Sequence, residues 1–136
     1  MVDYTVFFGL IILCLVVFVL YLRKPNPEPF IADPERIKCE SPIEFRLYDA
    51  LKIRGEYIRT QVPSGRFSID IALPAYHIAI ECDGKDNHST PKQKAHDRRK
   101  DQYLRKNGWK VLRFSGSRIY RDMKAIIARI EKEKKG

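Results

Sequence analysis

The pattern of hydrophobic and polar positions divides the chain into an apolar run and a longer mixed segment. Residues 4–22 carry no charge and are mainly Val, Ile, Leu and Phe. At about 1.5 Å per residue, a helix of this length spans roughly the 30 Å hydrocarbon core of a bilayer. A helix that is apolar on every side would be unusual in a small soluble domain. The pattern therefore predicts a transmembrane helix.

The residues that flank this run indicate its orientation. Tyr4 and Tyr21 lie at its two ends, where aromatic rings favour the membrane interface. Arg23 and Lys24 follow it, whereas the N-terminal side carries Asp3. The positive-inside rule then predicts a single-pass protein of the cell inner membrane with a cytoplasmic C-terminal domain. The alternative, a cleaved signal peptide, needs a basic start and a small-residue cleavage site, and the run has neither.

Proline marks the segment after the apolar run. The prolines are Pro25, Pro27, Pro29 and Pro34. They oppose a helix and favour an extended chain. We therefore expect an anchor over residues 1–24, a Pro-rich linker over residues 25–40 and one domain over residues 41–136.

Apolar periodicity predicts the elements of this domain. Ser41 can cap a helix, Pro42 suits its first position, Glu44 completes a capping box, and Gly55 ends it. Alternating apolar positions and turn residues predict further elements. These are strands at 57–62, 67–72, 76–82 and 109–114, and helices at 91–107 and 117–133. The order α-β-β-β-α-β-α predicts an α/β fold, with a mixed sheet flanked by helices.

Charge adds a class of partner to this fold. The net charge is +9, and residues 25–136 carry 24 Lys/Arg against 16 Asp/Glu. Residues 85–124 alone hold 13 Lys/Arg against four acids. Such an excess attracts polyanions, either nucleic acid or an anionic membrane face, although a solvated surface has the same composition. Cys14, Cys39 and Cys82 have no zinc or disulfide spacing, which fits a reducing compartment.

Two acids in apolar strands are the candidates for chemistry. Asp70 lies between Ile69 and Ile71, and Glu81 follows Ile80 in the next strand. Buried acids need a partner. If the two strands form a hairpin, the carboxylates meet and can bind a hard divalent cation, Mg²⁺ or Mn²⁺. Ion pairs with the many Lys and Arg residues are the alternative.

A wider set of positions resembles a known superfamily. The set is Glu44, Gln61-Val62, Asp70, Glu81-Cys82-Asp83-Gly84 and His88. Its order resembles the PD-(D/E)XK, or restriction-endonuclease-like, superfamily. More narrowly, it is similar to bacterial domains that resemble very-short-patch-repair endonucleases. The segments Asp97–Leu104 and Gly108–Phe114 match those domains' helix and closing strand, and the resemblance covers Ser41–Asp122.

The resemblance implies roles for the acids. Asp70 and Glu81 would be metal ligands, and the carbonyl oxygen of Cys82 would be a third. Glu44 would hold a water near the metal, or it would serve only the capping box. Gln61 would line the site or be an ordinary polar strand residue.

One position departs from the superfamily. Asp83 occupies the place of the usual lysine, and an acid cannot stabilise the charge that develops on a phosphate. In the similar domains a histidine is thought to assist, and His88 is the matching residue, either as a general base or phosphate contact or as an exposed loop histidine. Lys85 or Lys94 are candidates to replace the lysine.

The basic helix is the expected nucleic-acid surface. The residues expected to contact phosphates are Lys85, Lys92, Lys94, Arg98, Arg99 and Arg113, with Lys100, Arg105 and Lys106 on the same helix. Asp97 and Asp101 are expected to pair with Arg98 or Arg105, or else to approach the active site.

The resemblance and the apolar run together predict a membrane-anchored, metal-dependent endonuclease acting on DNA. A nucleic-acid-binding module that has lost cleavage is the main alternative, because Asp83 replaces the lysine. An adaptor whose basic face binds anionic lipid is a third.

Overall fold

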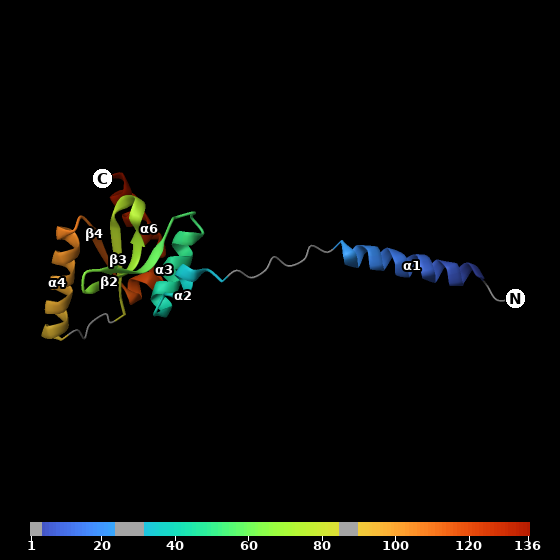
Figure 1. Ribbon diagram of the computed structural model, residues 1–136, viewed down its shortest axis with the longest axis horizontal. Helices are drawn as coiled ribbons and strands as arrows, with labels where there is room; N and C mark the ends of the chain where they lie inside the picture. The colour runs from blue at the N-terminus through green and yellow to red at the C-terminus, as the bar shows by residue number, and fades with distance from the viewer. Residues whose placement is uncertain (1–3, 24–31, 85–89) are drawn as a thin grey trace. The chain divides into compact units, whose positions relative to one another are not determined.

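The computed structural model describes residues 4–23, 32–84 and 90–136. The chain divides into two units, Met1–Ile31 and Ala32–Gly136. The first unit contains helix α1, Tyr4–Leu22 (Figure 1). All residues of α1 are exposed, and its length and composition suffice to cross a membrane.

The second unit is an α/β domain whose elements follow the predicted order. Its helices are α2 (Pro34–Ile37), α3 (Pro42–Lys52), the 3₁₀ turn η1 (Pro74–Tyr76), α4 (Pro91–Lys106), α5 (Gly116–Arg121) and α6 (Met123–Lys135). Its strands are β1 (Arg59–Ser64), β2 (Phe67–Leu73), β3 (Ile78–Asp83) and β4 (Lys110–Ser115). Ser41 caps α3, with its hydroxyl accepting from the Glu44 N–H at 3.4 Å.

The strands of the described residues form one mixed sheet in the order β1-β2-β3-β4. β1 pairs with β2 and β2 with β3 in antiparallel fashion, whereas β3 and β4 are parallel. The chain crosses from β3 to β4 through α4, as a parallel pair requires. The predicted mixed sheet and α/β class are confirmed.

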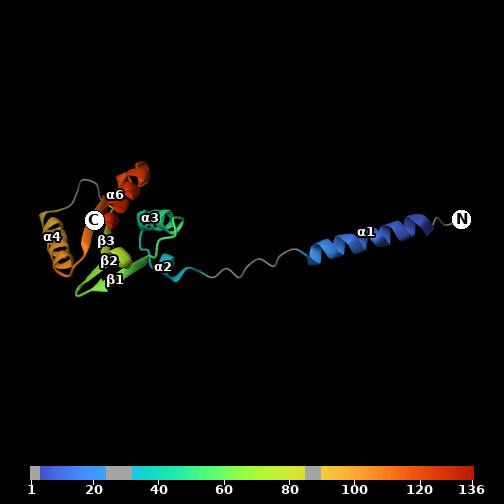
Figure 2. The same ribbon diagram turned by 90° about the horizontal axis from the view of Figure 1, so that it is seen from above.

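Helices cover both faces of the sheet (Figures 1 and 2). The larger core cluster joins α3, α5 and α6 to one face, and its fully buried members include Leu47, Leu51, Ile71, Ile80, Ile119 and Ile126. The smaller cluster joins α4 to the other face and consists of Ile69, Ala72, Ala79, Leu104 and Val111. Every residue of both clusters lies between Cys39 and Ile130, so the second unit holds its own core.

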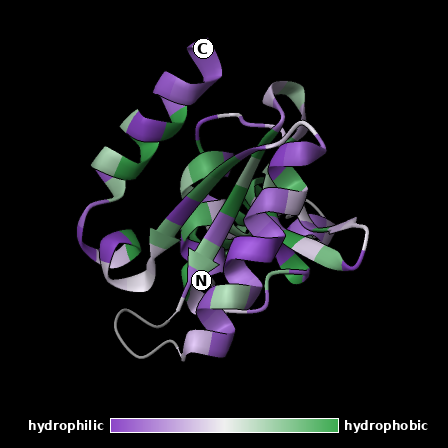
Figure 3. Cartoon of the chain, turned by 90° about the vertical axis from the view of Figure 1, so that its left-hand side faces the viewer, coloured by the Kyte–Doolittle hydropathy of each residue, from purple (hydrophilic) through white to green (hydrophobic). Residues whose placement is uncertain are grey.

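Helix α4 is the most polar element on the sheet. Figure 3 shows it as a mainly hydrophilic helix in front of mainly hydrophobic strands. Thr90 and Gln93 form a reciprocal capping box at its start. Leu104 is its one fully buried residue among those described. Apolar packing therefore attaches α4 mainly near its C-terminal end, and a ring contact between His96 and Phe67 of β2, with centroids 5.6 Å apart, adds to it further along the helix.

The domain begins earlier than the sequence suggests. Residues 32–40, expected to belong to the linker, are part of the compact unit. Asp33 caps α2 and accepts a 2.6 Å hydrogen bond from the Tyr48 hydroxyl, and Cys39 is buried. Glu35 accepts the Thr60 N–H of β1 at 2.6 Å. These contacts fasten the segment to α3 and β1.

The last predicted helix is two helices. Asp122 has a non-helical backbone, with φ −141° and ψ 53°, and its side chain accepts from the Ala125 N–H at 3.2 Å. A new N-cap therefore divides the helix backbone, although the apolar periodicity of residues 117–133 continues across it. The lysine-rich end is also helical up to Lys135, because Lys134 forms an ion pair with Glu56 at 2.5 Å.

Candidate active site

Asp70 and Glu81 come from neighbouring antiparallel strands. The register pairs Ile71 of β2 with Ile80 of β3, and one step further along brings Asp70 beside Glu81. The Asp70 Oδ2 atom accepts the Cys82 backbone N–H at 2.8 Å. Glu81 is 3% exposed, whereas the Asp70 side chain is 22% exposed. The predicted hairpin thus brings both carboxylates to one end of the sheet.

Lys100 of α4 reaches both carboxylates. Its Nζ atom donates to Glu81 Oε2 and lies 3.9 Å from Asp70 Oδ1. The Lys100 side chain is only 13% exposed, so these ion pairs lie in a partly dry environment. The sequence interpretation assigned Lys100 to the phosphate-tracking surface and considered Lys85 or Lys94 for the missing lysine. In the structure, the ammonium group beside the two carboxylates is instead that of Lys100.

Burial makes both acids harder to ionise. Burial and the neighbouring Asp70 charge raise the pKa of Glu81 to about 7, although the Lys100 ammonium opposes this. Burial likewise raises the pKa of Asp70, while the Cys82 N–H and Lys100 favour its ionised form. Two acids with raised pKa values at one point of a sheet are typical of a functional site.

The arrangement fits a divalent cation. The Glu81 Oε1 atom is buried and has no hydrogen-bond partner among the described residues. An oxygen in that position has free lone pairs for a metal, and the neighbouring Asp70 carboxylate accepts the Cys82 backbone N–H. Within the described ranges, no three His, Cys, Asp or Glu side chains gather as a metal site. The carboxylates of Asp70 and Glu81 are therefore the donors that the described contacts bring together there.

Glu44 takes part in a polar chain rather than pointing freely into the site. Its carboxylate is buried and accepts from the Glu40 N–H at 2.9 Å and from the Ser41 hydroxyl at 2.8 Å. The Gln61 amide also donates to it at 3.2 Å, and the Gln61 carbonyl accepts from Ser68 at 2.9 Å. Glu44 thus caps the helix and contacts the first strand at once.

The Asp83 carboxylate forms an ion pair with an arginine. It accepts from Arg113 Nη1 at 2.9 Å, and Asp101 accepts from Arg113 Nε and Nη2 at 3.0 and 2.8 Å. Asp97 lies 3.8 Å from the same guanidinium. The expectation that Asp97 and Asp101 pair with arginines of their own helix is wrong. Arg113, expected to contact nucleic acid, is a half-buried internal cation.

The acidic residues around Lys100 and Arg113 outnumber the basic ones, so this part of the domain attracts further cations. Burial alone would lower the pKa of Arg113, but the Asp101 hydrogen bond and the charges of Asp83, Asp101 and Asp97 raise it above its ordinary value. The described ion-pair cluster holds the carboxylates Asp70, Glu81, Asp83, Asp97 and Asp101 and the cations Lys100 and Arg113. Fully ionised, five negative and two positive charges leave a net −3, which a metal ion would offset.

The remaining predicted residues divide into two groups. Lys92, Lys94, Arg98 and Arg99 are exposed on α4. His88 and Lys85 lie outside the described residues. The residue that the sequence interpretation missed is Lys100, and one signal identifies it. Asp97, Lys100, Asp101 and Leu104 follow the spacing i, i+3, i+4, i+7 of a single helix face.

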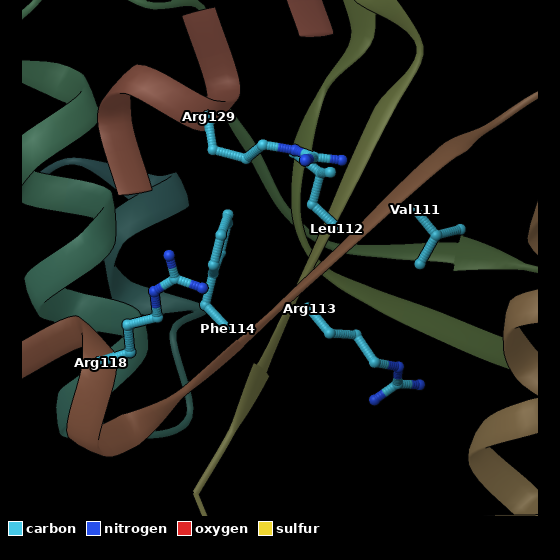
Figure 4. A pocket seen from close by; sticks show the side chains of 6 residues that line it. All are labelled: Val111, Leu112, Arg113, Phe114, Arg118 and Arg129. Atoms are coloured by element: carbon cyan, nitrogen blue, oxygen red, sulfur yellow. The ribbon is translucent and has the colours of Figure 1, made fainter. Parts of the chain in front are cut away.

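A separate pocket of about 240 Å³ lies on the other side of β4. Its lining includes Phe114, Arg118 and Arg129 (Figure 4). In that view Arg113 points to the opposite side of the strand. Arg129 forms an ion pair with Glu133 at 2.8 Å, and no carboxylate lines the pocket. Among its described lining residues, Arg113 is the one that also belongs to the acidic cluster.

Comparison with known proteins identifies the family. Residues 44–133 match the family model REase_MTES_1575, which covers about two thirds of the chain and all the clustered carboxylates. The chain belongs to this restriction-endonuclease-like family. The predicted resemblance to the restriction-endonuclease-like superfamily is therefore confirmed. Family membership supports a nuclease-like function in general terms.

A solved structure gives the same fold. The domain is similar to the catalytic domain of the homing endonuclease I-Bth0305I, with a TM-score of 0.58 and 22% identity. The match covers 68% of this chain and 93% of that domain. A comparison with curated proteins gave no match. The structural likeness thus extends over nearly the whole homing-endonuclease domain and shows the fold.

Proposed function

We propose that this chain is a metal-dependent endonuclease that hydrolyses phosphodiester bonds in DNA and is anchored to a membrane by α1. The observation that carries the proposal is the group of Asp70, Glu81 and Lys100. Two carboxylates with raised pKa values and a half-buried ammonium meet at one end of the sheet of a restriction-endonuclease-like family member.

Each member of the group has a role in this proposal. Asp70, Glu81 and the carbonyl oxygen of Cys82 would hold Mg²⁺ or Mn²⁺. A bound ion would supply positive charge and Lewis acidity next to the scissile phosphate. Lys100 stabilises negative charge on the phosphate, which Asp83 cannot do. His88 remains a proposed proton acceptor or phosphate contact, and Glu44 supports the site through Gln61.

The outer surface of α4 supports DNA as the substrate. Lys92, Lys94, Arg98 and Arg99 are exposed there, on the helix that also carries Lys100. Contacts with phosphates position a duplex without reading its sequence. The similarity to very-short-patch-repair endonucleases remains part of the proposal. A role in a particular repair pathway does not follow, because one fold supports many functions.

The apolar helix supports a tethered enzyme. α1 is uncharged over its whole length and is followed by Arg23, with Lys24 next in sequence. We propose a single-pass protein of the cell inner membrane with its nuclease domain in the cytoplasm. We expect the protein to sediment with membranes after an alkaline carbonate wash and to keep the mass of the full chain. A soluble, shortened chain would instead indicate cleavage of the segment.

Plasmid nicking tests the enzyme. The fragment 32–136, which holds its own core, is incubated with supercoiled plasmid and Mg²⁺, Mn²⁺ or EDTA. We expect nicking that needs the metal and is lost in Asp70→Ala and Glu81→Ala. Asp49→Ala is the matched control, because Asp49 forms an ion pair with Arg36 away from the cluster. Equal activity in all variants would contradict the proposal.

A binding module without cleavage is the second candidate. Asp83 in the place of the superfamily's lysine, with its charge engaged by Arg113, is the observation that favours it. For this candidate we expect the protein to bind a labelled duplex with an affinity that falls steeply as salt concentration rises, and to release no cleavage product at any metal concentration. Preference for anionic vesicles over DNA would contradict both candidates.

A further inference from the structure

Arg113 is bound on three sides by carboxylates from two elements. Its Nε and Nη2 atoms donate to Asp101 of α4 at 3.0 and 2.8 Å, and its Nη1 atom donates to Asp83 of β3 at 2.9 Å. Asp97 lies one turn before Asp101 and 3.8 Å from Nη2. Since Arg113 itself belongs to β4, one guanidinium ties α4 to two parallel strands.

The face of α4 that Arg113 holds also carries Lys100. Lys100 follows Asp97 by three positions and immediately precedes Asp101, so these side chains share one side of the helix. Leu104, one turn later, is fully buried against the sheet. Leu104 thus fixes the C-terminal part of α4 and the contact of His96 with Phe67 holds its earlier part, while the Arg113 ion pairs hold the turn between them, which carries Lys100.

We propose that Arg113 is a positioning residue that acts through Lys100. By holding α4 against β3 and β4, it keeps the ammonium group at the distance from which it reaches both Asp70 and Glu81. The inference rests on the proposed function, in which Lys100 stabilises the phosphate. It adds a part of the site that touches neither metal nor substrate.

Arg113 acts in a second way, through charge. Asp101 adjoins Lys100 on α4, and Asp83 lies two residues after Glu81 on β3. Both carboxylates are engaged by Arg113. Without the guanidinium they would be half-buried anions in need of a cation. Lys100, which adjoins Asp101 on the same helix, would then be drawn toward them and away from Asp70 and Glu81. The planar guanidinium suits this task, because its fork binds two carboxylates at fixed angles.

The first arm of the test measures Lys100 itself. The full-length chain in detergent micelles is acetylated with a water-soluble ester, and peptide mass spectrometry compares Lys100 with exposed Lys106. We expect slow acetylation of Lys100 in the wild type. Arg113→Gln and Asp101→Asn should accelerate it by about tenfold or more, as local opening of a held segment does. Arg36→Gln removes a comparable bidentate pair between α2 and α3 and should leave it unchanged.

The second arm measures catalysis. Arg113→Gln should lower the kcat of plasmid nicking by about tenfold while changing the KM for DNA less than about twofold, because the exposed phosphate contacts of α4 remain. Loss expressed mainly in KM would overturn the proposal. The proposal would also be overturned if Lys100 were acetylated at the wild-type rate in Arg113→Gln and Asp101→Asn variants whose circular dichroism shows that they are folded. If Arg113→Gln does not fold, Asp101→Asn decides.

The two proposals can fail separately. A wild-type chain that nicks no DNA removes the proposed nuclease, yet the acetylation arm still decides whether Arg113 holds Lys100 in place. A chain that nicks DNA while Lys100 is acetylated equally fast with and without Arg113 keeps the nuclease and loses the positioning role.

Discussion

Lys100 Nζ lies 3.9 Å from Asp70 Oδ1, although 30 positions separate the two residues and they belong to a helix and a strand. The same ammonium donates to Glu81 of the adjacent strand. A helix residue thus joins the carboxylates of two neighbouring strands into one ion-paired group. This relationship gives the first prediction.

Lys100→Met should abolish most cleavage while leaving DNA binding intact. The ammonium is the one positive group beside both carboxylates among the described residues, and removing one such stabilising group lowers kcat on the order of 10²-fold. Single-turnover nicking with excess fragment measures the rate. Lys124→Met, on the exposed surface of α6, is the control and should keep wild-type activity. Half or more of the activity remaining in Lys100→Met would contradict the role.

Stability without metal should fall as pH rises. The folded pKa of Glu81 is raised from an ordinary 4.5 to about 7, so the native state binds this proton more tightly than the unfolded state. The resulting stabilisation is complete below about pH 4.5 and is lost as pH rises through about 7, amounting to about 3 kcal/mol. Urea unfolding of fragment 32–136 in EDTA between pH 5 and 8 measures it.

Glu81→Gln provides the comparison for this pH dependence. The amide cannot ionise, so the variant should lose the decline attributed to Glu81 and become relatively more stable at pH 8. Asp49→Asn is the control, because the Arg36 hydrogen bond lowers the pKa of Asp49 and any stability it provides is lost only in more acidic solution. Parallel stability curves for wild type and Glu81→Gln would contradict the raised pKa.

Exposed arginines of α4 should set the salt dependence of DNA binding. Each phosphate contact contributes about 0.9 to the slope of log K against log salt concentration. Replacing Arg98 and Arg99 with Gln should therefore reduce the magnitude of the slope by about 1.8 and weaken binding similarly for unrelated sequences. Fluorescence anisotropy with two unrelated duplexes measures both. Lys124→Gln on α6 is the control, and an equal effect there would indicate only general charge.

The β1–β2 turn should tolerate no side chain at Gly65. Gly65 has φ +59°, and an added Cβ would overlap the Tyr103 hydroxyl of α4. Gly108 has φ +86° and open space around it, so Gly108→Ala measures only the cost of a side chain in left-handed backbone, about 1–2 kcal/mol. Gly65→Ala should lower the free energy of unfolding by more than Gly108→Ala. The excess should disappear when Tyr103 is replaced by Ala, and its persistence would place the strain elsewhere.

Most of the fold is predictable because its elements carry local signals. The Ser41 cap and the alternation around Asp70 mark elements that form as expected. The split at Asp122 was missed because apolar periodicity continues through it, while a side-chain cap starts a new helix. The domain start was missed because prolines suggest a linker, although Asp33 caps a short helix that packs on the sheet.

The candidate site was predictable only in part. Neighbouring strands bring Asp70 and Glu81 together, which a hairpin pattern indicates. Lys100 and Arg113 depend on how α4 crosses the sheet and on the parallel register that pairs Glu81 with Arg113. Neither the path of α4 across the sheet nor the parallel register is a local property of the sequence. The side chains of the two basic residues look like phosphate contacts in sequence. For Lys100, the helix face that it shares with Leu104 is a signal in the sequence, whereas for Arg113 only its burial beside acids reveals the difference.

The fastening of residues 33–36 has a mechanical consequence. Glu35 bonds the Thr60 N–H of β1, and Arg36 makes two bonds to Asp49 of α3. A pulling force that arrives along the chain from its N-terminal side meets these bonds before it reaches the core strands. If α1 is held in a bilayer while the domain is bound elsewhere, this short segment carries the load and shields the end of the sheet that holds Asp70 and Glu81 from distortion.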